Sequence, residues 1–223
     1  MCAEGEKGEA AIVRRLITDI YPSGLVSIVS DSYNFWTFLT SIIQGLKPEI
    51  MERDGKVIIR PDSGNPLHII CGDPNADPTH PAYKGALQIL WEIFGGVEND
   101  TGYKVLDSHI GLIYGDSITV NIAKEILERM YTMGFCSSNI VFGVGSYSYQ
   151  YVTRDTFNFA MKATHAVING RDQVIFKDPV TANKSKTSAK GYLRVERTQY
   201  AGTYYLLENQ TREEEAQGEL QIV

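Results

Sequence analysis

The chain has 223 residues, of which 43% are hydrophobic and 22% are charged, and its formal net charge is −6. This length is enough to bury a hydrophobic core, and the composition is ordinary for a globular protein. The acidic balance argues against a general nucleic-acid-binding protein, and no apolar run approaches the ~20 residues that a membrane-spanning helix needs.

The start of the chain and its cysteines indicate the compartment. The first ten residues, MCAEGEKGEA, contain neither the apolar core nor the cleavage site of a signal peptide. Cys2, Cys71 and Cys136 are odd in number and scattered, without a CxxC spacing. This usage is typical of free thiols in a reducing compartment, so we expect a cytoplasmic protein without a cysteine metal site.

The first two thirds of the chain alternate between predicted strands and helices. Apolar residues at helical spacing predict a first helix over residues 8–20. Four apolar runs then predict strands, at residues 25–31, 56–62, 109–117 and 139–146. Helices are predicted at residues 32–46, 84–96 and 119–134, with Pro66 in the first turn of a further segment and a surface loop at 71–83. Strands that alternate with helices in this way predict βαβ units and a parallel sheet.

After residue 146 the pattern changes, because two predicted strands follow each other with little room for a helix between them. ATHAVING (163–170) and QVIFKDP (173–179) are predicted strands, and residues 191–208 alternate with period two around YAGT, which predicts a β-hairpin. An acidic tail follows. A closed β/α barrel needs eight strands in roughly 250 residues, so the α/β chain is either an open sheet or part of a larger barrel.

Three predicted strands end in an aspartate, namely Asp31, Asp62 and Asp116. Ligands of parallel α/β folds meet the carboxyl ends of the strands, so three such carboxylates favour a site for a polyhydroxylated substrate or a hard cation such as Mg²⁺. The alternative is that each aspartate only caps the helix that follows it.

The stretch VIIRPDSGNP (57–66) places two opposite charges, Arg60 and Asp62, on either side of Pro61. Residues i and i+2 of an extended strand share a face, and the proline fixes the backbone between them. Both side chains are therefore expected to point into one space, the arginine toward an anion and the aspartate toward hydroxyls or a metal. The alternative is a local ion pair, which contributes little when it is exposed.

The stretch FGVGSYSYQYVTRD (142–155) is a second candidate site. Gly143 and Gly145 follow a predicted strand, where a glycine turn lets backbone N–H groups surround an anion. A single GxG is usually only a tight turn, but basic residues follow it. They are Arg154, Lys162, Lys177, Lys184, Lys186 and Lys190. The last three could simply belong to a solvated loop, but in an acidic protein the enrichment indicates phosphate binding.

The histidines do not indicate a further site. The four histidines lack ligand spacing, and His165 is expected to be a core or edge residue. An acidic rim with a phosphate-binding turn favours sugar-phosphate chemistry, by transfer or by isomerisation. An isomerase or aldolase on a β/α barrel would need a Schiff-base lysine or an acid–base pair at a strand end, and no convincing one is found.

Several segments taken together resemble the nicotinamide phosphoribosyltransferases. They are VSIVSDSY, IIRPDSGNP, YGDS, FGVGSYSYQYVTRD, MKATHAVING and FKDPVTANKSKTSAKG, and their order matches the C-terminal half of that family. RPDSGNP distinguishes this family from its nicotinate-using relatives. The resemblance implies a partial type II phosphoribosyltransferase β/α barrel with a C-terminal β-hairpin extension. It also implies transfer of phosphoribosyl from phosphoribosyl pyrophosphate to nicotinamide, in NAD salvage.

The resemblance also implies residue roles. Ser27 and Arg60 would line the nicotinamide pocket, and Asp31, Asp62, Gly115 and Asp116 would hold the ribose, the amide or the metal-bound diphosphate. Asp62, Arg60 and Asp31 are the residues expected at the reacting centre. Phosphate would be bound by residues of the second half, some of them across a homodimer interface, namely Gly145, Ser146, Arg154, Lys162, Lys177 and Lys184.

The family implies more than this chain supplies. Mg²⁺ would accompany phosphoribosyl pyrophosphate, and the histidine that the family phosphorylates during ATP-coupled turnover has no counterpart here. We therefore expect a C-terminal fragment whose partner is the missing N-terminal half. Residues 1–178 would form the partial barrel, and 179–223 a basic loop, a hairpin and an acidic tail. The alternative function is a non-catalytic fragment that only binds phosphoribosyl compounds or nucleotides.

Overall fold

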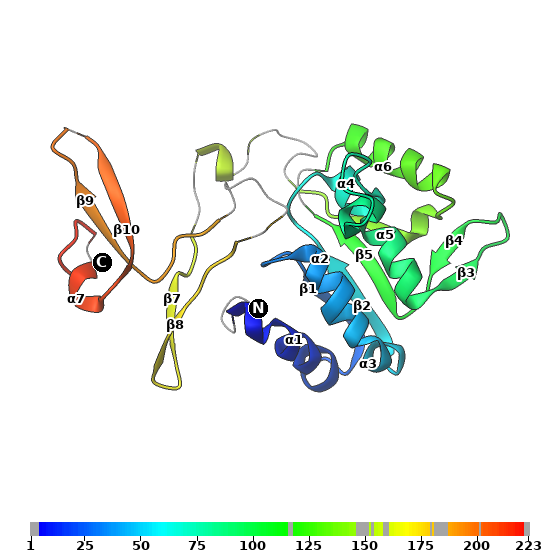
Figure 1. The fold of residues 1–223 in the computed structure, drawn as a ribbon, viewed down its shortest axis with the longest axis horizontal. Helices are drawn as coiled ribbons and strands as arrows, with labels where there is room; N and C mark the ends of the chain where they lie inside the picture. Colours follow the sequence, from blue (N-terminus) through cyan, green and yellow to red (C-terminus); the bar gives the residue numbers. More distant parts are fainter. Residues whose placement is uncertain are drawn as a thin grey trace.

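A computed structural model of the chain describes residues 5–115, 118–145, 152, 154–157, 161–178, 180, 187–200 and 202–220, with the side chains of residues 154 and 155 left out. The protein contains a mixed α/β body and a C-terminal part made of β-hairpins (Figure 1).

The centre of the body is a four-stranded parallel sheet in the order β1-β2-β5-β6 (Figure 1). Its strands are β1 (Ser23–Val29), β2 (Asp54–Arg60), β5 (Ile110–Tyr114) and β6 (Ile140–Phe142). All four overlap the predicted strands, and the predicted parallel sheet is confirmed. The spatial order of these four strands is the same as their order in the chain, so no connection skips a strand of this sheet.

Helices connect the strands and carry the apolar side chains that build the core. They are α1 (Gly5–Arg15) with the π-helical η2 (Leu16–Ile20), α2 (Phe35–Thr37) with the π-helical η3 (Phe38–Ile43), α3 (Lys47–Met51), α4 (Pro66–Cys71), α5 (Pro81–Phe94), α6 (Val120–Thr132) and the 3₁₀ turn η4 (Ser137–Asn139). Capping explains several starts, since Asn34, Asn65, His80 and Thr119 each accept a hydrogen bond from the first turn of the next helix.

The helices bury one face of the sheet only. Val26, Ile28, Val57, Ile59 and other strand residues of that face are at most 7% exposed and belong to one apolar cluster with the helices. Burial of this cluster is the main source of stability for the body.

The other face of the sheet is open in the described part of the chain. Leu25 is 73% exposed and Val141 is 56% exposed, while Ile58 and Ile113 are half-buried. The alternation of burial along each strand therefore separates a covered face from an uncovered face.

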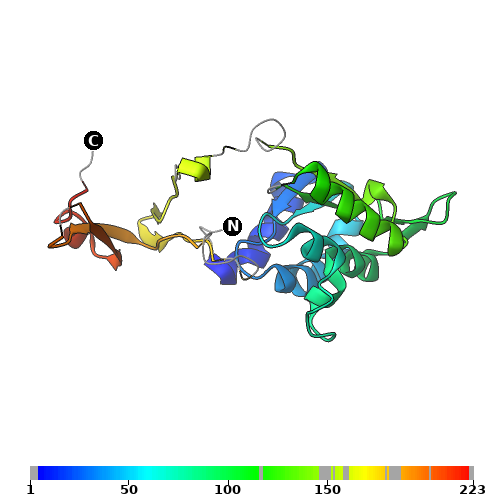
Figure 2. The same cartoon turned by 90° about the horizontal axis from the view of Figure 1, so that it is seen from above.

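The remaining strands pair as antiparallel hairpins. β3 (Gly96–Glu98) pairs with β4 (Lys104–Leu106), β7 (His165–Ile168) with β8 (Arg171–Val174), and β9 (Tyr192–Arg197) with β10 (Tyr204–Gln210). The hairpin predicted over 191–208 is thus present, whereas β3–β4 was not predicted. The 3₁₀ turn η6 (Arg154–Phe157) and α7 (Arg212–Glu215) complete the elements. Figure 2 shows that the last two hairpins extend away from the helical body.

The structure differs from the predicted elements in two regions, one after β2 and one before it. The loop predicted at 71–83 is shorter, because Pro81 already begins α5 behind its cap His80, and α5 contains a kink at Gly85. The segment Lys47–Met51 is also helical, with Pro48 in its first turn. Among the described residues, no helix combines the length and the apolar composition that a membrane span requires.

Candidate functional site at the carboxyl ends of the strands

The turn after β2 is fixed by its own sequence. Gly64 has φ +89°, a backbone conformation that residues with a Cβ rarely adopt. The Asn65 side chain accepts hydrogen bonds from the N–H groups of Leu67 and His68, at 3.0 and 3.3 Å, and Pro66 occupies the first turn of α4. The stretch SGNP therefore turns the chain sharply into a helix and leaves Arg60 and Asp62 at the end of the sheet.

Arg60 and Asp62 form an ion pair in which Nη2 and Oδ1 are 3.3 Å apart. Their side chains are 34% and 32% exposed, so both groups are accessible from solution. The two side chains point toward each other, as predicted, and they also form the local ion pair that was the alternative. A guanidinium has five N–H donors, and the Asp62 contact leaves several of them for a ligand.

Asp31, directly after β1, is fully buried and links this turn to a distant part of the chain. Its Oδ2 accepts a hydrogen bond from the Asp62 N–H at 3.0 Å, and its Oδ1 lies 3.5 Å from the Lys177 Nζ. The strand ends are joined in addition by the Ser30 N–H, which donates to the Arg60 carbonyl at 3.1 Å. Two carboxylates and two cations therefore form a charge-balanced group, the rim cluster: Asp31, Arg60, Asp62 and Lys177.

Glycines at the ends of β5 and β6 give the rim cluster its space. A Cβ at Gly115 would lie 2.9 Å from the Arg60 Nη2, so the guanidinium passes directly over this glycine. A Cβ at Gly143 would in turn lie 2.7 Å from the Gly115 Cα, and the Gly143 N–H donates to the Tyr114 carbonyl at 2.7 Å. Without a side chain at Gly115, β5 can lie this close to Arg60, and without one at Gly143, the end of β6 can lie this close to Gly115.

The structure places the other predicted residues as follows. Ser27 lies on the uncovered face of β1. It is in register with Ile58 of β2, which precedes Arg60 by two residues on the same face. Gly145 and Lys162 are exposed, and within the described residues the Lys162 side chain forms no hydrogen bond or ion pair with the rim cluster. Asp116, Ser146 and Lys184 lie outside the described residues, as does the side chain of Arg154, whose backbone begins η6.

Glu9 of α1 is a further buried carboxyl group close to this end of the sheet. It is 4% exposed, and its Oε1 has no hydrogen-bond partner among the described residues. Burial is the main cause that raises the pKa of Glu9 from 4.5 to about 7, and the Glu6 and Asp31 carboxylates raise it further. Glu9 was not predicted, because a glutamate in a helix gives no sequence signal for burial.

Two supporting residues were also not predicted. The buried Tyr114 donates its hydroxyl to the Gly64 carbonyl at 3.0 Å, which ties β5 to the turn after β2. The Ser188 Oγ accepts the Lys177 N–H at 2.6 Å. YGDS at the end of β5 could have suggested Tyr114, whereas no local pattern marks Ser188.

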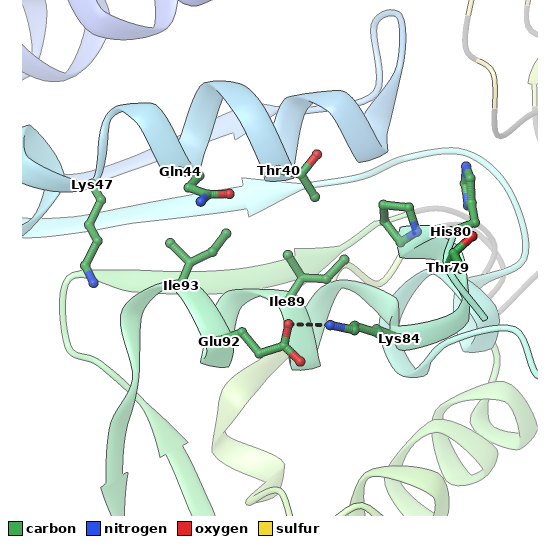
Figure 3. Close-up of a pocket in the computed structure, with 10 residues that line it drawn as sticks. Thr40, Gln44, Lys47, Thr79, His80, Lys84, Ile89, Glu92 and Ile93 are labelled. Carbon is green, nitrogen blue, oxygen red and sulfur yellow. Dashed lines mark hydrogen bonds and ion pairs between the residues drawn. The ribbon is translucent and has the colours of Figure 1, made fainter. Parts of the chain in front are cut away.

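Two cavities elsewhere contain none of the predicted site residues. A cleft of about 430 Å³ lies between the η3–α3 helical segment and α5, where Thr40, Gln44 and Lys47 face Ile89 and Ile93, and Lys84 pairs with Glu92 at 2.8 Å (Figure 3). A cavity of about 650 Å³ lies between the β7–β8 and β9–β10 hairpins, beside His165 and Tyr192. Of the predicted residues, Asp31, Arg60, Asp62 and Lys177 meet at the strand ends, and none of these four lines either cavity.

The chain is therefore an α/β protein with a cluster of charged side chains at the carboxyl ends of its parallel strands, which is where proteins of this class bind ligands. A family model described as the Nicotinate phosphoribosyltransferase (NAPRTase) family matches residues 8–218. The chain belongs to this family.

Individual relatives are nicotinamide enzymes. The chain is 53% identical to the nicotinamide phosphoribosyltransferase of Acinetobacter baylyi, over 100% of this chain and 45% of the relative. It is 40% identical to that of Mycoplasma pneumoniae, over 81% of this chain and 40% of the relative, and 33% identical to that of Xanthomonas campestris, over 90% and 40%. The chain thus spans less than half the length of these relatives.

Proposed function

We propose that the chain is the C-terminal portion of a nicotinamide phosphoribosyltransferase. The reaction would join nicotinamide to the phosphoribosyl group of phosphoribosyl pyrophosphate and release pyrophosphate. The observation that carries this proposal is the rim cluster, which places paired cations and carboxylates at the strand ends of a chain 53% identical to such an enzyme.

The rim cluster suits this chemistry. Departure of pyrophosphate leaves positive charge on the ribosyl ring, which a nearby carboxylate stabilises, and negative charge on the diphosphate, which cations stabilise. The accessible Asp62 carboxylate would face the ribose, and Arg60 and Lys177 would face nicotinamide or phosphate oxygens. Positioning and electrostatics, without a protein nucleophile, would lower the barrier.

Further residues are proposed on the resemblance alone. Ser27 would face the nicotinamide from β1. Phosphate groups would contact Gly145 and the basic residues of the second half, some of them in a homodimer partner. Four more residues are proposed although the structure does not describe their side chains, namely Asp116, Ser146, Arg154 and Lys184.

Mg²⁺ would reach the site on the diphosphate. Among the described residues, no three His, Cys, Asp or Glu side chains are grouped to hold a metal ion, and Asp62 is the accessible carboxylate of the rim cluster. A single carboxylate fits an ion that is held mostly by substrate oxygens and water. When bound, the ion would neutralise charge on the diphosphate.

We also propose that residues 1–178 are part of a type II phosphoribosyltransferase β/α barrel, with residues 179–223 as an extension. Strands in chain order with helices on one face support a barrel segment, since a doubly wound sheet reverses its strand order and has helices on both faces. The uncovered face, with Leu25 and Val141, would be covered by the part of the enzyme that corresponds to the remainder of the relatives. A reducing compartment such as the cytoplasm fits the free thiols of Cys71 and Cys136.

The proposal is tested by co-expressing the chain with the segment of the Acinetobacter baylyi enzyme that it does not cover. We expect the purified pair to form nicotinamide mononucleotide from nicotinamide and phosphoribosyl pyrophosphate with Mg²⁺, as measured by mass spectrometry. An associated, soluble pair that forms no product contradicts the proposal.

A second candidate function is binding without catalysis. The observation that favours it is the open face of the sheet, because half of a barrel can retain the rim cluster yet lack the groups opposite it. Calorimetry with nicotinamide mononucleotide on the chain alone separates the candidates. Binding by a chain whose pair forms no product supports this second function, and an absence of binding rejects it.

A further inference from the structure

The segment around Lys177 is held against the end of β1 by contacts that no local pattern predicts. The N–H of Asp178 donates to the Ser32 carbonyl at 3.2 Å, and the N–H of Val180 donates to the Tyr33 carbonyl at 3.1 Å. The Phe176 ring packs edge-on against Tyr33, with centroids 5.7 Å apart. We call residues 176–178 the docked segment.

Ser188 fixes the backbone of the docked segment from its other side. Its Oγ accepts the Lys177 N–H at 2.6 Å, and its own N–H donates to the Lys177 carbonyl at 3.0 Å. Ser188 is 6% exposed, and the Lys190 ammonium lies 4.3 Å from the Phe176 ring centroid. The backbone of Lys177 is thus bonded on both polar groups, so its side chain leaves the segment in a defined direction.

The Asp31 carboxylate lies where that side chain ends. It is fully buried, and its two oxygens face different partners, the Asp62 N–H at 3.0 Å and the Lys177 Nζ at 3.5 Å. A buried carboxylate needs hydrogen-bonded or charged partners to offset its lost hydration. With no exposed surface, it has no free side to offer a substrate in this arrangement.

Lys177 differs from Asp31 in this respect. Its side chain is 25% exposed, and an ammonium has three N–H donors, of which the Asp31 contact engages one. The remaining donors can reach a phosphate oxygen at the rim of the sheet. The ion pair therefore holds the Lys177 ammonium in place and leaves some of its N–H donors for a ligand.

We propose that Asp31 is a positioning residue, whose buried carboxylate holds the Lys177 ammonium at the rim so that Lys177 binds a phosphate or diphosphate group, while Asp31 itself touches no ligand. This assignment rests on the proposed phosphoribosyl chemistry for the identity of the ligand. The positioning contact itself rests only on the geometry of Asp31, Lys177 and the docked segment.

The positioning contact is tested by amide hydrogen exchange on the full chain. Asp31→Asn keeps the size of the side chain and an acceptor for the Asp62 N–H, but it removes the charge. We expect exchange of the Asp178 and Val180 amides to quicken roughly tenfold, as expected for a lost charge-assisted bond, with α6 amides unchanged. Asp54→Asn, an exposed change at the start of β2, is the control. Unchanged exchange in Asp31→Asn overturns the positioning contact.

The ligand role is tested by calorimetry with inorganic pyrophosphate and Mg²⁺. Asp31→Asn and Lys177→Met should each weaken binding roughly tenfold, and the double variant should bind no more weakly than Lys177→Met alone. Lys177→Arg should restore most of the affinity. If Asp31→Asn weakens binding further in the Lys177→Met background, Asp31 contacts the ligand and the assignment is wrong.

The two measurements separate the possible failures. A wild-type chain that binds no pyrophosphate, with exchange quickened in Asp31→Asn, would contradict the phosphate role of Lys177 while supporting the positioning contact. Ser188→Ala, which removes an acceptor without changing any charge, should also quicken exchange at Asp178, and its failure to do so would contradict the role of the docked segment.

Discussion

Two arginines at opposite ends of β2 have opposite environments. Arg53, just before the strand, is 7% exposed, and its guanidinium donates to the carbonyl oxygens of Ile17, Tyr21 and Gly24. Arg60, the last residue of the strand, is about a third exposed and forms an ion pair with Asp62 at 3.3 Å.

Under the proposed function, the difference means that one end of this sheet serves stability and the other end serves ligand binding. The amino-terminal end is closed by a buried arginine whose two terminal guanidinium nitrogens donate to backbone carbonyl oxygens. The carboxyl-terminal end keeps an arginine with donors to spare, above glycines that give it room. This division matches the general behaviour of parallel α/β folds, in which the carboxyl ends of the strands carry the chemistry.

The largest expected effect separates the two arginines directly. Arg53→Met should lower the free energy of unfolding by about 3–5 kcal/mol, because three carbonyl oxygens lose a charged donor in a buried site. Arg60→Met should lower it by less than about 1 kcal/mol, since an ion pair that is accessible to solvent contributes little. Urea unfolding followed by circular dichroism gives both values, and equal losses would remove the distinction.

The two faces of β2 offer a second comparison. Ile59 is fully buried on the covered face, and Ile58 is half-buried on the uncovered face. Ile59→Ala should cost about 2–4 kcal/mol and Ile58→Ala about 1 kcal/mol or less in the chain alone. The cost of Ile58→Ala should rise when the remainder of the enzyme is bound. A cost that stays the same in the complex would mean that this face is not covered there.

The buried Glu9 gives a pH-dependent prediction. Because burial raises the pKa of Glu9 from 4.5 to about 7, the folded protein holds a proton that the unfolded chain has lost between these values. Stability should therefore fall as the pH rises from about 4.5 to 7. Glu9→Gln should raise the free energy of unfolding at pH 8 by up to about 2 kcal/mol, after discounting for solvent screening, and change it little at pH 4.

Unfolding at several pH values checks this prediction. Glu125→Gln, the same change at an exposed position of α6, is the control and should not alter the pH dependence. A Glu9→Gln variant with the wild-type pH dependence would show that this carboxyl group is not responsible.

The smallest expected effect on stability concerns Gly115. Gly115→Ala should change the free energy of unfolding by less than about 1 kcal/mol, because the flexible end of Arg60 can move away from the new Cβ. Pyrophosphate or nucleotide binding should nevertheless weaken, since Arg60 is displaced. Gly111→Ala is the matched control on the same strand, where the Cβ would meet the Lys56 side chain at 3.1 Å. Calorimetry that finds equal affinities for both variants contradicts the proposal that Gly115 keeps Arg60 in its binding position.

Local patterns were sufficient for most of the body. β-branched runs bounded by polar residues predicted the four sheet strands, and Pro66 was expected in the first turn of the segment that is α4 in the structure. The direction of Arg60 and Asp62 also followed from the strand period and Pro61. Short elements escaped prediction, because the three-residue strands of the β3–β4 hairpin are too brief to show a period.

Contacts between distant residues could not be predicted from spacing. Lys177 reaches Asp31 across 146 positions, and only the fold makes them neighbours. The burial of Asp31 and Glu9 is equally invisible in sequence, since each stands in a stretch that could be exposed. The sequence therefore indicated which residue types meet at the rim, while their division into buried and accessible groups required the structure.

The most direct measurement is nicotinamide mononucleotide formation by the complex of this chain with the uncovered segment of its relative. Arg60→Met should lower the rate at least about 100-fold, as loss of a preorganised charged donor does, while the free energy of unfolding falls by less than about 1 kcal/mol. Lys56→Met, on the same strand and face, should leave the rate near that of the wild type. A near wild-type rate in Arg60→Met would contradict the account that the strand-end charges carry the reaction.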